Sequence, residues 1–305
     1  MNNKGNNRER NAYDSRFKNI IRNSTVLSKI IKDNVDGMGD LTLDEIKGCL
    51  DIEEDGKSVK GRNTEFGSMD NGEIRVDSLF DVRLPDGNGH IDLIVNIEAQ
   101  WGPNPGYSLA KRAEYYIGRL VSEQKNTYFS NDDYDGLRKV YCIWLILNPN
   151  RRDWNKVIRG RMVTEVINGT ADTNDPVFDT YNITFINVGP YDDTQPDMVS
   201  FPSTMFNRMD DNDRIHLLDT RFNIELDDSI IEELGNMKTL DEQIYDSAYG
   251  KGRTDEKKEL VDFYVEEILK EVSEDATIEK ALSNSMIRPD VKDRVESEVK
   301  RRLSE

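Results

Sequence analysis

Residues 76–100 have the sequence VDSLFDVRLPDGNGHIDLIVNIEAQ, and this stretch decides the fold. Apolar and polar side chains alternate through residues 73–84 and again through residues 90–99, which is typical of β-strands with two different faces. Between them, residues 85–89 are Pro-Asp-Gly-Asn-Gly, a strong turn signal. The stretch therefore predicts an antiparallel β-hairpin whose two open ends lie side by side.

The flanking sequence predicts helices on both sides of this hairpin. Towards the amino terminus, residues 24–50 contain two short helical patterns, which Gly37 and Gly39 separate. Towards the carboxyl terminus, an apolar stripe predicts a helix over residues 108–124, with Ser108 as its cap.

Further strands and helices follow. The continuous apolar run VYCIWLIL at 140–147 is typical of a buried central strand, and residues 181–188 are another candidate strand. Beyond about residue 205 the periodicity is helical, most clearly at 260–272 and 291–303. The order of elements predicts an α/β fold with a helical extension.

The chain is expected to contain three regions. Residues 1–20 begin with an Asn-rich and charged segment and are predicted to be disordered. Residues 21–200 are predicted to form the α/β domain, and residues 201–305 an acidic helical region. The acidic residues of that region are explained by solvated helix faces, by shielding of a basic face, or by dimerisation through residues 260–272.

Composition restricts the class of protein. Of 305 residues, 36% are hydrophobic and 33% are charged, which is typical of a soluble globular protein. No apolar run approaches the roughly 18 residues of a membrane span, and the first residues lack the apolar core of a secretory signal. We therefore expect a cytoplasmic protein without a membrane partner. Cys49 and Cys142 lie far apart and there are two histidines, so chemistry is expected to depend on carboxylates.

Charge is distributed unevenly along the chain. The formal net charge is −18, which by itself disfavours nucleic acid as a partner. Residues 101–161, however, carry a net charge of +5, whereas residues 1–100 carry −5 and residues 162–305 carry −18. A basic surface therefore remains compatible with the sequence.

Acidic and amide side chains gather at the open end of the predicted hairpin. Glu98 and Gln100 lie two residues apart on one strand, so their side chains leave the same face. The hairpin brings Asp77 back to this strand end. Two carboxylates with a backbone carbonyl suit Mg²⁺ or Mn²⁺, which polarises a phosphoryl oxygen, and Gln100 would orient the attacking water. Asp81 is a rival metal ligand and Glu65 an auxiliary one.

The sequence resembles the PD-(D/E)XK nuclease superfamily, and within it the recombination-promoting nucleases (Rpn, YhgA-like) and the PD-(D/E)XK nuclease family transposases. The resemblance rests on residues 76–100 followed by SLAKRAEYYIGRLVSEQ at 108–124, and it covers about residues 60–150. It implies a restriction-endonuclease-like core, in which helices flank a central mixed β-sheet. It also implies metal-dependent hydrolysis of DNA, with Asp77 and Glu98 as ligands of Mg²⁺ or Mn²⁺.

One position departs from the superfamily. Most members have lysine where this chain has Gln100, although glutamine is common in the family that it resembles. A lysine ammonium stabilises developing negative charge, whereas an amide only orients by hydrogen bonds. The family's arginine and tyrosine, one helical turn apart, correspond to Arg112 and Tyr116. We expect Arg112 or Lys111 to supply the missing cation, Arg112 at the scissile phosphate, and Tyr116 to pack its ring while its hydroxyl faces the site.

A basic group follows the predicted central strand. It comprises Arg151, Arg152, Lys156, Arg159 and Arg161, with Trp154 among them. Because cations bind a phosphate backbone and an aromatic ring stacks on a base, we consider this group, together with Lys111, as a candidate surface for nucleic acid. A solvated loop explains the same composition equally well.

The sequence leaves several functions open. The resemblance implies a Mg²⁺-dependent deoxyribonuclease with DNA as its substrate. Gln100 and the net charge favour the alternative, a catalytically weak or inactive nuclease fold that binds nucleic acid or protein, including as an inhibitor. A third hypothesis is an acidic protein that mimics DNA, which the basic segment disfavours. A homodimer would suit cleavage of two strands, but nothing in the sequence fixes it.

Overall fold

The computed structural model describes residues 3–62, 65–68, 72–86, 89–102, 104–163, 165–170, 179–207, 209–237 and 292–303, with residues 261, 264–266, 268, 269, 272 and 282. The chain divides into two compact units. The larger unit is Asn11–Thr239, and the smaller comprises Met1–Arg10 and Leu240–Glu305.

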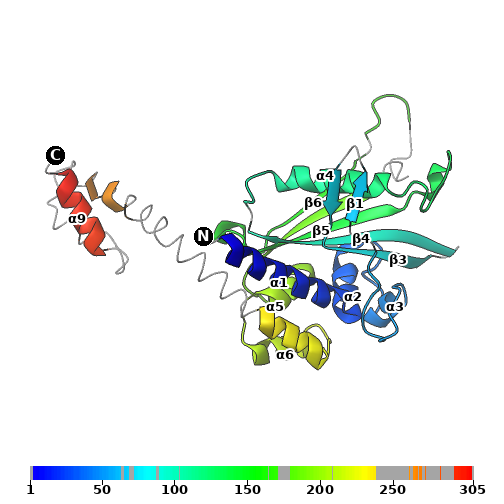
Figure 1. Cartoon of the computed structure of the whole chain (residues 1–305), viewed down its shortest axis with the longest axis horizontal. Helices are drawn as coiled ribbons and strands as arrows, with labels where there is room; N and C mark the ends of the chain where they lie inside the picture. Colours follow the sequence, from blue (N-terminus) through cyan, green and yellow to red (C-terminus); the bar gives the residue numbers. More distant parts are fainter. Residues whose placement is uncertain are drawn as a thin grey trace. The chain divides into compact units, whose positions relative to one another are not determined.

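A five-stranded mixed sheet forms the centre of the larger unit (Figure 1). In spatial order its strands are β3 (Ser78–Asp86), β4 (Gly89–Trp101), β5 (Lys139–Leu147), β7 (Tyr181–Val188) and β6 (Val157–Arg161). Strands β4, β5 and β7 are parallel, whereas β3 and β6 run antiparallel to their neighbours at the two edges. The predicted α/β class and the strands expected at 140–147 and 181–188 are confirmed.

The predicted hairpin is confirmed as the β3–β4 pair. Its register joins Ser78 to Ile97 at the open end and Asp86 to Gly89 at the turn. The turn residues 87 and 88 lie outside the described residues.

The strand predicted over residues 73–84 is divided in two. Gly72–Arg75 form β2, which pairs with β1 (Glu65–Ser68) in a separate two-stranded sheet. Val76 and Asp77 then connect β2 to β3. Alternation of apolar and polar residues continues across this break, so the pattern alone could not reveal it. The division places Asp77 where the chain enters the main sheet.

Helices cover both faces of the sheet. Figure 1 shows α4 (Leu109–Ser122) on one side, and α2 (Ser24–Asn34) and α5 (Asp197–Phe206) on the other. Ser108 caps α4 as predicted, because its hydroxyl accepts a hydrogen bond from the Lys111 backbone N–H. A core of apolar residues lies beneath α4, including Ile94, Ala113, Tyr116, Ile117, Leu120, Val140, Cys142 and Trp144.

The two helical patterns at 24–50 are also confirmed, as α2 and as α3 (Leu43–Lys47). Asn23 caps α2, since its side chain accepts hydrogen bonds from two backbone N–H groups of the first turn. Thr42 and Glu45 form a reciprocal capping box at the start of α3.

The amino-terminal region differs from the expected disorder of residues 1–20. Residues Asn3–Arg22 form helix α1. Tyr13, Phe17 and Ile20 are buried, and their spacing of four and three residues places them on one helical face. Phe17 packs against Phe206 with ring centres 5.3 Å apart. The polar first residues concealed this short apolar stripe.

The domain boundary expected at residue 200 falls within α5. The larger unit continues through α6 (Asp211–Thr220) to Thr239 because residues such as Phe201 and Leu218 are buried in it. In the smaller unit, α9 (Lys292–Arg302) agrees with the helix predicted at 291–303. Its Val295 and Val299 pack with apolar residues of the 261–272 region, where only some residues are described.

Within the described part of the chain, no helix combines the length and the apolar character that crossing a membrane requires.

Candidate metal centre at the open end of the hairpin

Asp77 and Glu98 lie side by side at the open end of the hairpin. Because Ser78 pairs with Ile97, the next position of the register brings Asp77 to Glu98. The Asp77 backbone N–H donates a hydrogen bond to Glu98 Oε1 at 3.1 Å, and the Ala99 backbone N–H donates to Asp77 Oδ2 at 3.0 Å. The predicted proximity of the two acids is confirmed.

Burial disfavours the charged state of this pair. Glu98 is 1% exposed, and burial raises its pKa, which the neighbouring charge of Asp77 raises further. Burial also raises the pKa of Asp77. Asn96 offsets part of this effect, since its Nδ2 donates to Glu98 Oε1 at 3.1 Å. The pair therefore favours a bound proton or a bound cation.

The donor atoms of the pair fit a hard divalent cation. Carboxylate oxygens suit Mg²⁺, which commonly binds through one or two carboxylates and keeps several waters. Among the described residues, no group of three or more His, Cys, Asp and Glu side chains could hold a metal ion. Asp77 and Glu98 would therefore hold the cation together with backbone oxygens and water.

Arg112 lies near enough to Asp77 and Glu98 for its charge to lower the pKa of both acids, and aromatic side chains hold it in place. Its Nη1 donates to Tyr107 Oη at 2.8 Å and lies 3.4 Å from Gln100 Oε1, while its Nη2 donates to Tyr116 Oη at 2.8 Å. The guanidinium also lies 4.9 Å from the ring centre of Tyr116 and 5.2 Å from that of Trp144. The ring of Tyr116 is buried against Trp144, so the packing predicted for this tyrosine is confirmed.

Gln100 makes hydrogen bonds with both ends of its amide. Its Oε1 faces Arg112, and its Nε2 donates to the carbonyl oxygen of Trp101 at 3.2 Å. Both contacts lie at the end of β4. Orientation of a water molecule by Gln100 stays a prediction, and it is compatible with both contacts because an amide has two N–H donors and two acceptor positions.

Lys18 is a residue of this site that the sequence did not indicate. It lies on α1, and its Nζ is 3.8 Å from Asp77 Oδ1. Throughout the described residues, no other Lys, Arg or His nitrogen forms an ion pair with Asp77 or Glu98. The available signal was the spacing of Tyr13, Phe17 and Ile20, which would have predicted a helix instead of disorder.

Asp81 lies in a different cluster. Its Oδ1 accepts hydrogen bonds from Tyr128 Oη at 2.7 Å and from Arg138 Nη1 at 3.1 Å, and Arg62 Nε lies 3.5 Å from its Oδ2. Cations therefore already surround this rival ligand. Glu65, the auxiliary candidate, is in β1, and its side chain lies outside the described residues.

The basic group after β5 divides into two parts. The first part surrounds Trp154, which is 41% exposed and lies 5.6 Å from the Arg151 guanidinium. Arg152 and Lys156 form ion pairs of 3.5 and 3.7 Å with Asp153. Since β5 ends beside the end of β4, this exposed part begins at the same end of the sheet as Gln100.

The second part is the edge strand β6. Arg159 contacts Asp36 at 3.7 Å and Thr184 Oγ1 at 3.3 Å, so much of its charge serves the fold. Arg161 is exposed, as is Lys111 at the start of α4. The alternative of a solvated loop therefore does not describe residues 157–161, which pair with β7.

Comparisons of the chain with protein-family models, curated proteins and solved structures found no match.

Proposed function

We propose that this protein is a metal-dependent deoxyribonuclease of the PD-(D/E)XK type, which hydrolyses phosphodiester bonds of DNA with Mg²⁺ or Mn²⁺. The observation that carries the proposal is the pair of Asp77 and Glu98, two adjacent carboxylates whose pKa values burial raises despite the charge of Arg112. Such a pair favours an exogenous cation over an ordinary structural role.

The order of elements around the pair supports the proposal. A hairpin carries both acids, the helix α4 follows with Arg112 and Tyr116, and β5 returns parallel to β4. This order agrees with the restriction-endonuclease-like core that the sequence resemblance implies. The mixed sheet alone is compatible with many α/β folds, so the site carries more weight than the topology.

Each residue of the site has a defined role in the proposed hydrolysis. Asp77 and Glu98 would hold the cation, which when bound polarises a phosphoryl oxygen and lowers the pKa of a coordinated water. Arg112, oriented by Tyr116 and Tyr107, would contact the phosphate. Gln100 would orient the attacking water.

The reaction itself is balanced without a further reactant. The oxygen of one water molecule forms a bond to phosphorus, and the bond from phosphorus to one deoxyribose oxygen breaks. The electron pair of that bond stays with the deoxyribose oxygen, which takes up a proton. The attacking water releases a proton to solvent, and the products are a phosphate monoester and a hydroxyl group.

Cleavage of supercoiled plasmid tests the proposal. With Mg²⁺ or Mn²⁺ we expect nicking by the natural protein and a loss of about 1,000-fold or more in Glu98→Ala, because a metal ligand is removed. Asp92→Asn is the matched control: Asp92 lies on the same strand but pairs with Arg138 at 2.7 Å. Equal cleavage by Glu98→Ala and the natural protein would exclude Glu98 from the mechanism.

A second candidate function is binding of nucleic acid without hydrolysis. It is favoured by the amide of Gln100, which offers no positive charge at the position of the superfamily lysine. Such a protein would retard DNA in the presence of chelator and leave it intact with every divalent metal. Cleavage that depends on Glu98 separates the two functions.

A further inference from the structure

The proposed nuclease site is deficient in positive charge on its own strands. Gln100 occupies the position of the superfamily lysine, and it is neutral. Arg112 is bound by two tyrosine hydroxyls and lies over three aromatic rings, those of Tyr107, Tyr116 and Trp144. Neither strand of the hairpin therefore supplies an ammonium group to the phosphate.

Lys18 reaches the site from helix α1. The 3.8 Å between its Nζ and Asp77 Oδ1 is an ion-pair distance, but it exceeds the length of a hydrogen bond. The side chain of Lys18 is 39% exposed. It lines a cavity of about 300 Å³ together with Asp77, Arg22 and Arg62. The ammonium thus has space beside it on the side of Asp77 that faces this cavity.

The other cations near this cavity are held elsewhere. Arg22 donates to Glu53 Oε1 at 3.1 Å and to the carbonyl oxygen of Val59 at 3.2 Å. Arg62 Nε lies 3.5 Å from Asp81 Oδ2. Only Lys18, among the cations that line this cavity, lies within ion-pair distance of the candidate metal ligands.

Contacts along α1 fix the position of Lys18. The Tyr13 ring meets the Trp101 ring edge-on with centres 5.3 Å apart, directly after Gln100. Further along α1, Arg16 Nη1 and Asn19 Nδ2 both donate to the carboxylate of Glu233, at 2.6 and 3.1 Å. A long flexible side chain is thereby presented to the site by a well-anchored helix.

We propose that Lys18 is a further catalytic residue, whose ammonium contacts the scissile phosphate and stabilises the negative charge that develops there. This inference rests on the proposed nuclease function. Lys18 makes and breaks no covalent bond in this role, and it transfers no proton. Lys18 supplies, from helix α1 near the start of the domain, the positive charge that Gln100 lacks.

Three variants test the proposal in the full chain. Lys18→Met removes the charge, Lys18→Arg retains it, and Lys47→Met is a control that removes the charge of a lysine paired with Asp44 on helix α3. The measurements are the single-turnover rate on plasmid DNA with Mg²⁺, the affinity for Mn²⁺ by electron paramagnetic resonance, and binding of a duplex oligonucleotide in chelator at several salt concentrations.

We expect Lys18→Met to cleave about 100-fold more slowly or worse, with Lys18→Arg within about tenfold of the natural protein. The affinity of Lys18→Met for Mn²⁺ should be retained or increased, because Lys18 repels a cation at Asp77. Its binding of DNA in chelator should weaken, with a salt slope that is smaller by about 0.9. Lys47→Met should leave all three quantities within about threefold.

Three outcomes would overturn the proposal. A rate for Lys18→Met within about threefold of the natural protein would remove Lys18 while the nuclease function stands. Loss of Mn²⁺ affinity or unfolding of Lys18→Met would assign it a structural role instead. No metal-dependent cleavage by the natural protein would refute the proposed function, and this inference with it.

Discussion

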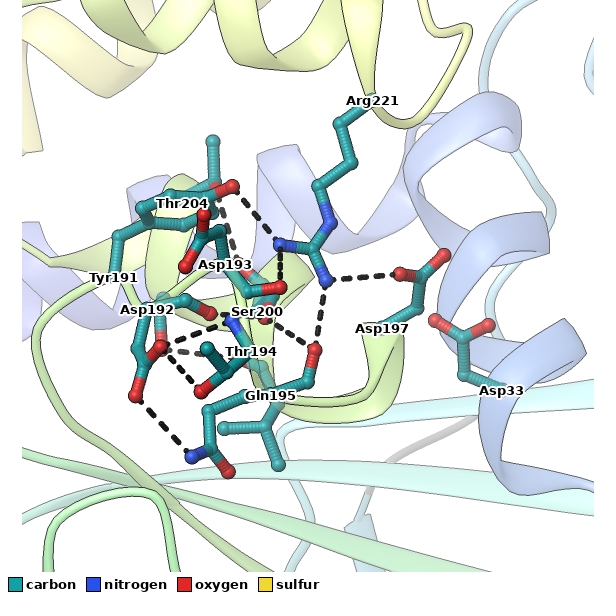
Figure 2. A network of polar contacts seen from close by, with 12 residues as sticks. Asp33, Tyr191, Asp192, Asp193, Thr194, Gln195, Asp197, Ser200, Thr204 and Arg221 are labelled. Atoms are coloured by element: carbon teal, nitrogen blue, oxygen red, sulfur yellow. Dashed lines mark hydrogen bonds and ion pairs between the residues drawn. The ribbon is translucent and has the colours of Figure 1, made fainter.

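Two regions of the larger unit contain buried carboxylates, and they differ in the cations that lie close to these carboxylates. Around the start of α5, Lys29 Nζ contacts Asp33 at 2.8 Å and Asp197 at 2.7 Å. Arg221 adds an ion pair of 3.3 Å to Asp197 and binds nearby backbone carbonyls (Figure 2). At the hairpin, the ion pair that the described residues form with Asp77 and Glu98 is that of Lys18 with Asp77, at 3.8 Å, and Arg112 acts on both acids through its charge.

The pKa values of the acids in the two regions differ accordingly. Burial raises the pKa of Asp197, but the hydrogen bond and charge of Lys29, with those of Arg221, outweigh it and lower that pKa overall. Burial prevails at Asp33, whose pKa is raised to about 6 despite Lys29. At Glu98, burial and the charge of Asp77 act in the same direction. In the first region cations outweigh the effect of burial at Asp197, whereas in the second burial prevails at both acids.

The largest effect on stability is expected from the loss of Lys29, whose charge balances those of Asp33 and Asp197. Lys29 is 4% exposed, and Lys29→Met would leave Asp33 without its cation and Asp197 with only Arg221. Because uncompensated buried charge is costly, we expect the free energy of unfolding to fall by about 3–5 kcal/mol. Urea denaturation measures this change.

A surface pair provides the control for that variant. Lys47 pairs with Asp44, whose side chain is 91% exposed, so Lys47→Met should cost less than about 0.5 kcal/mol. A loss below about 1 kcal/mol in Lys29→Met would show that the ion pairs of Lys29 with Asp33 and Asp197 contribute little to stability.

At the hairpin, removal of a charged group is expected to increase the free energy of unfolding instead of lowering it. Because the pKa of Glu98 is higher in the folded than in the unfolded state, its ionisation destabilises the fold as pH rises through that raised pKa. In chelator at pH 8, Glu98→Gln should therefore be more stable than the natural protein by about 1–3 kcal/mol. The difference should disappear near pH 4, where Glu98 is protonated in both states.

Urea denaturation at both pH values checks this expectation. Asp92→Asn is again a suitable control, because Asp92 has an arginine partner at 2.7 Å and should not gain stability on neutralisation. A Glu98→Gln variant that is less stable than the natural protein at pH 8 would contradict a strained carboxylate pair.

A divalent cation bound by Asp77 and Glu98 should offset the repulsion between these two buried carboxylates. With Mg²⁺ at ten times its dissociation constant, the natural protein should gain about 1.4 kcal/mol of stability, and Glu98→Gln should gain none. The gain should be smaller at pH 6 than at pH 8, because protons compete for the carboxylates whose pKa is raised. Thermal unfolding with and without Mg²⁺ measures it, and equal gains in both proteins would place the cation elsewhere.

The smallest effect concerns the orientation of Arg112. Tyr116→Phe removes the hydroxyl that accepts from Arg112 Nη2 but keeps the ring that packs on Trp144. We expect cleavage to slow about three- to tenfold, with a stability change below about 1 kcal/mol. Tyr134→Phe, at a residue that is 60% exposed, should change neither. Unaltered cleavage by Tyr116→Phe would show that its hydroxyl does not orient Arg112.

Local patterns in the sequence predicted most of the sheet. The β3–β4 hairpin, the capped helix α4 and the buried strand β5 each have a periodicity or turn signal within a short window. The break at Asp77 was not predictable, because β2 and β3 keep the same alternation although they belong to different sheets. Helix α1 was not predicted because its apolar stripe begins only at Tyr13, after a mostly polar segment.

The candidate site was predictable only in part. The meeting of Asp77 and Glu98 follows from hairpin geometry, which local sequence determines. The contact of Lys18 with Asp77 depends on how α1 packs, and this packing uses residues as distant as Phe206 and Glu233. Such long-range contacts leave no periodic trace in one sequence.

The bonds from α1 to Glu233 have a consequence for biosynthesis. Arg16 and Asn19 leave the ribosome early, whereas their shared partner follows 217 and 214 residues later. During translation the sheet and its two acids can assemble while the first helix still lacks this anchor. A nascent or truncated chain would therefore carry the carboxylate pair while α1, and Lys18 with it, lacks this anchor, until synthesis has passed residue 233.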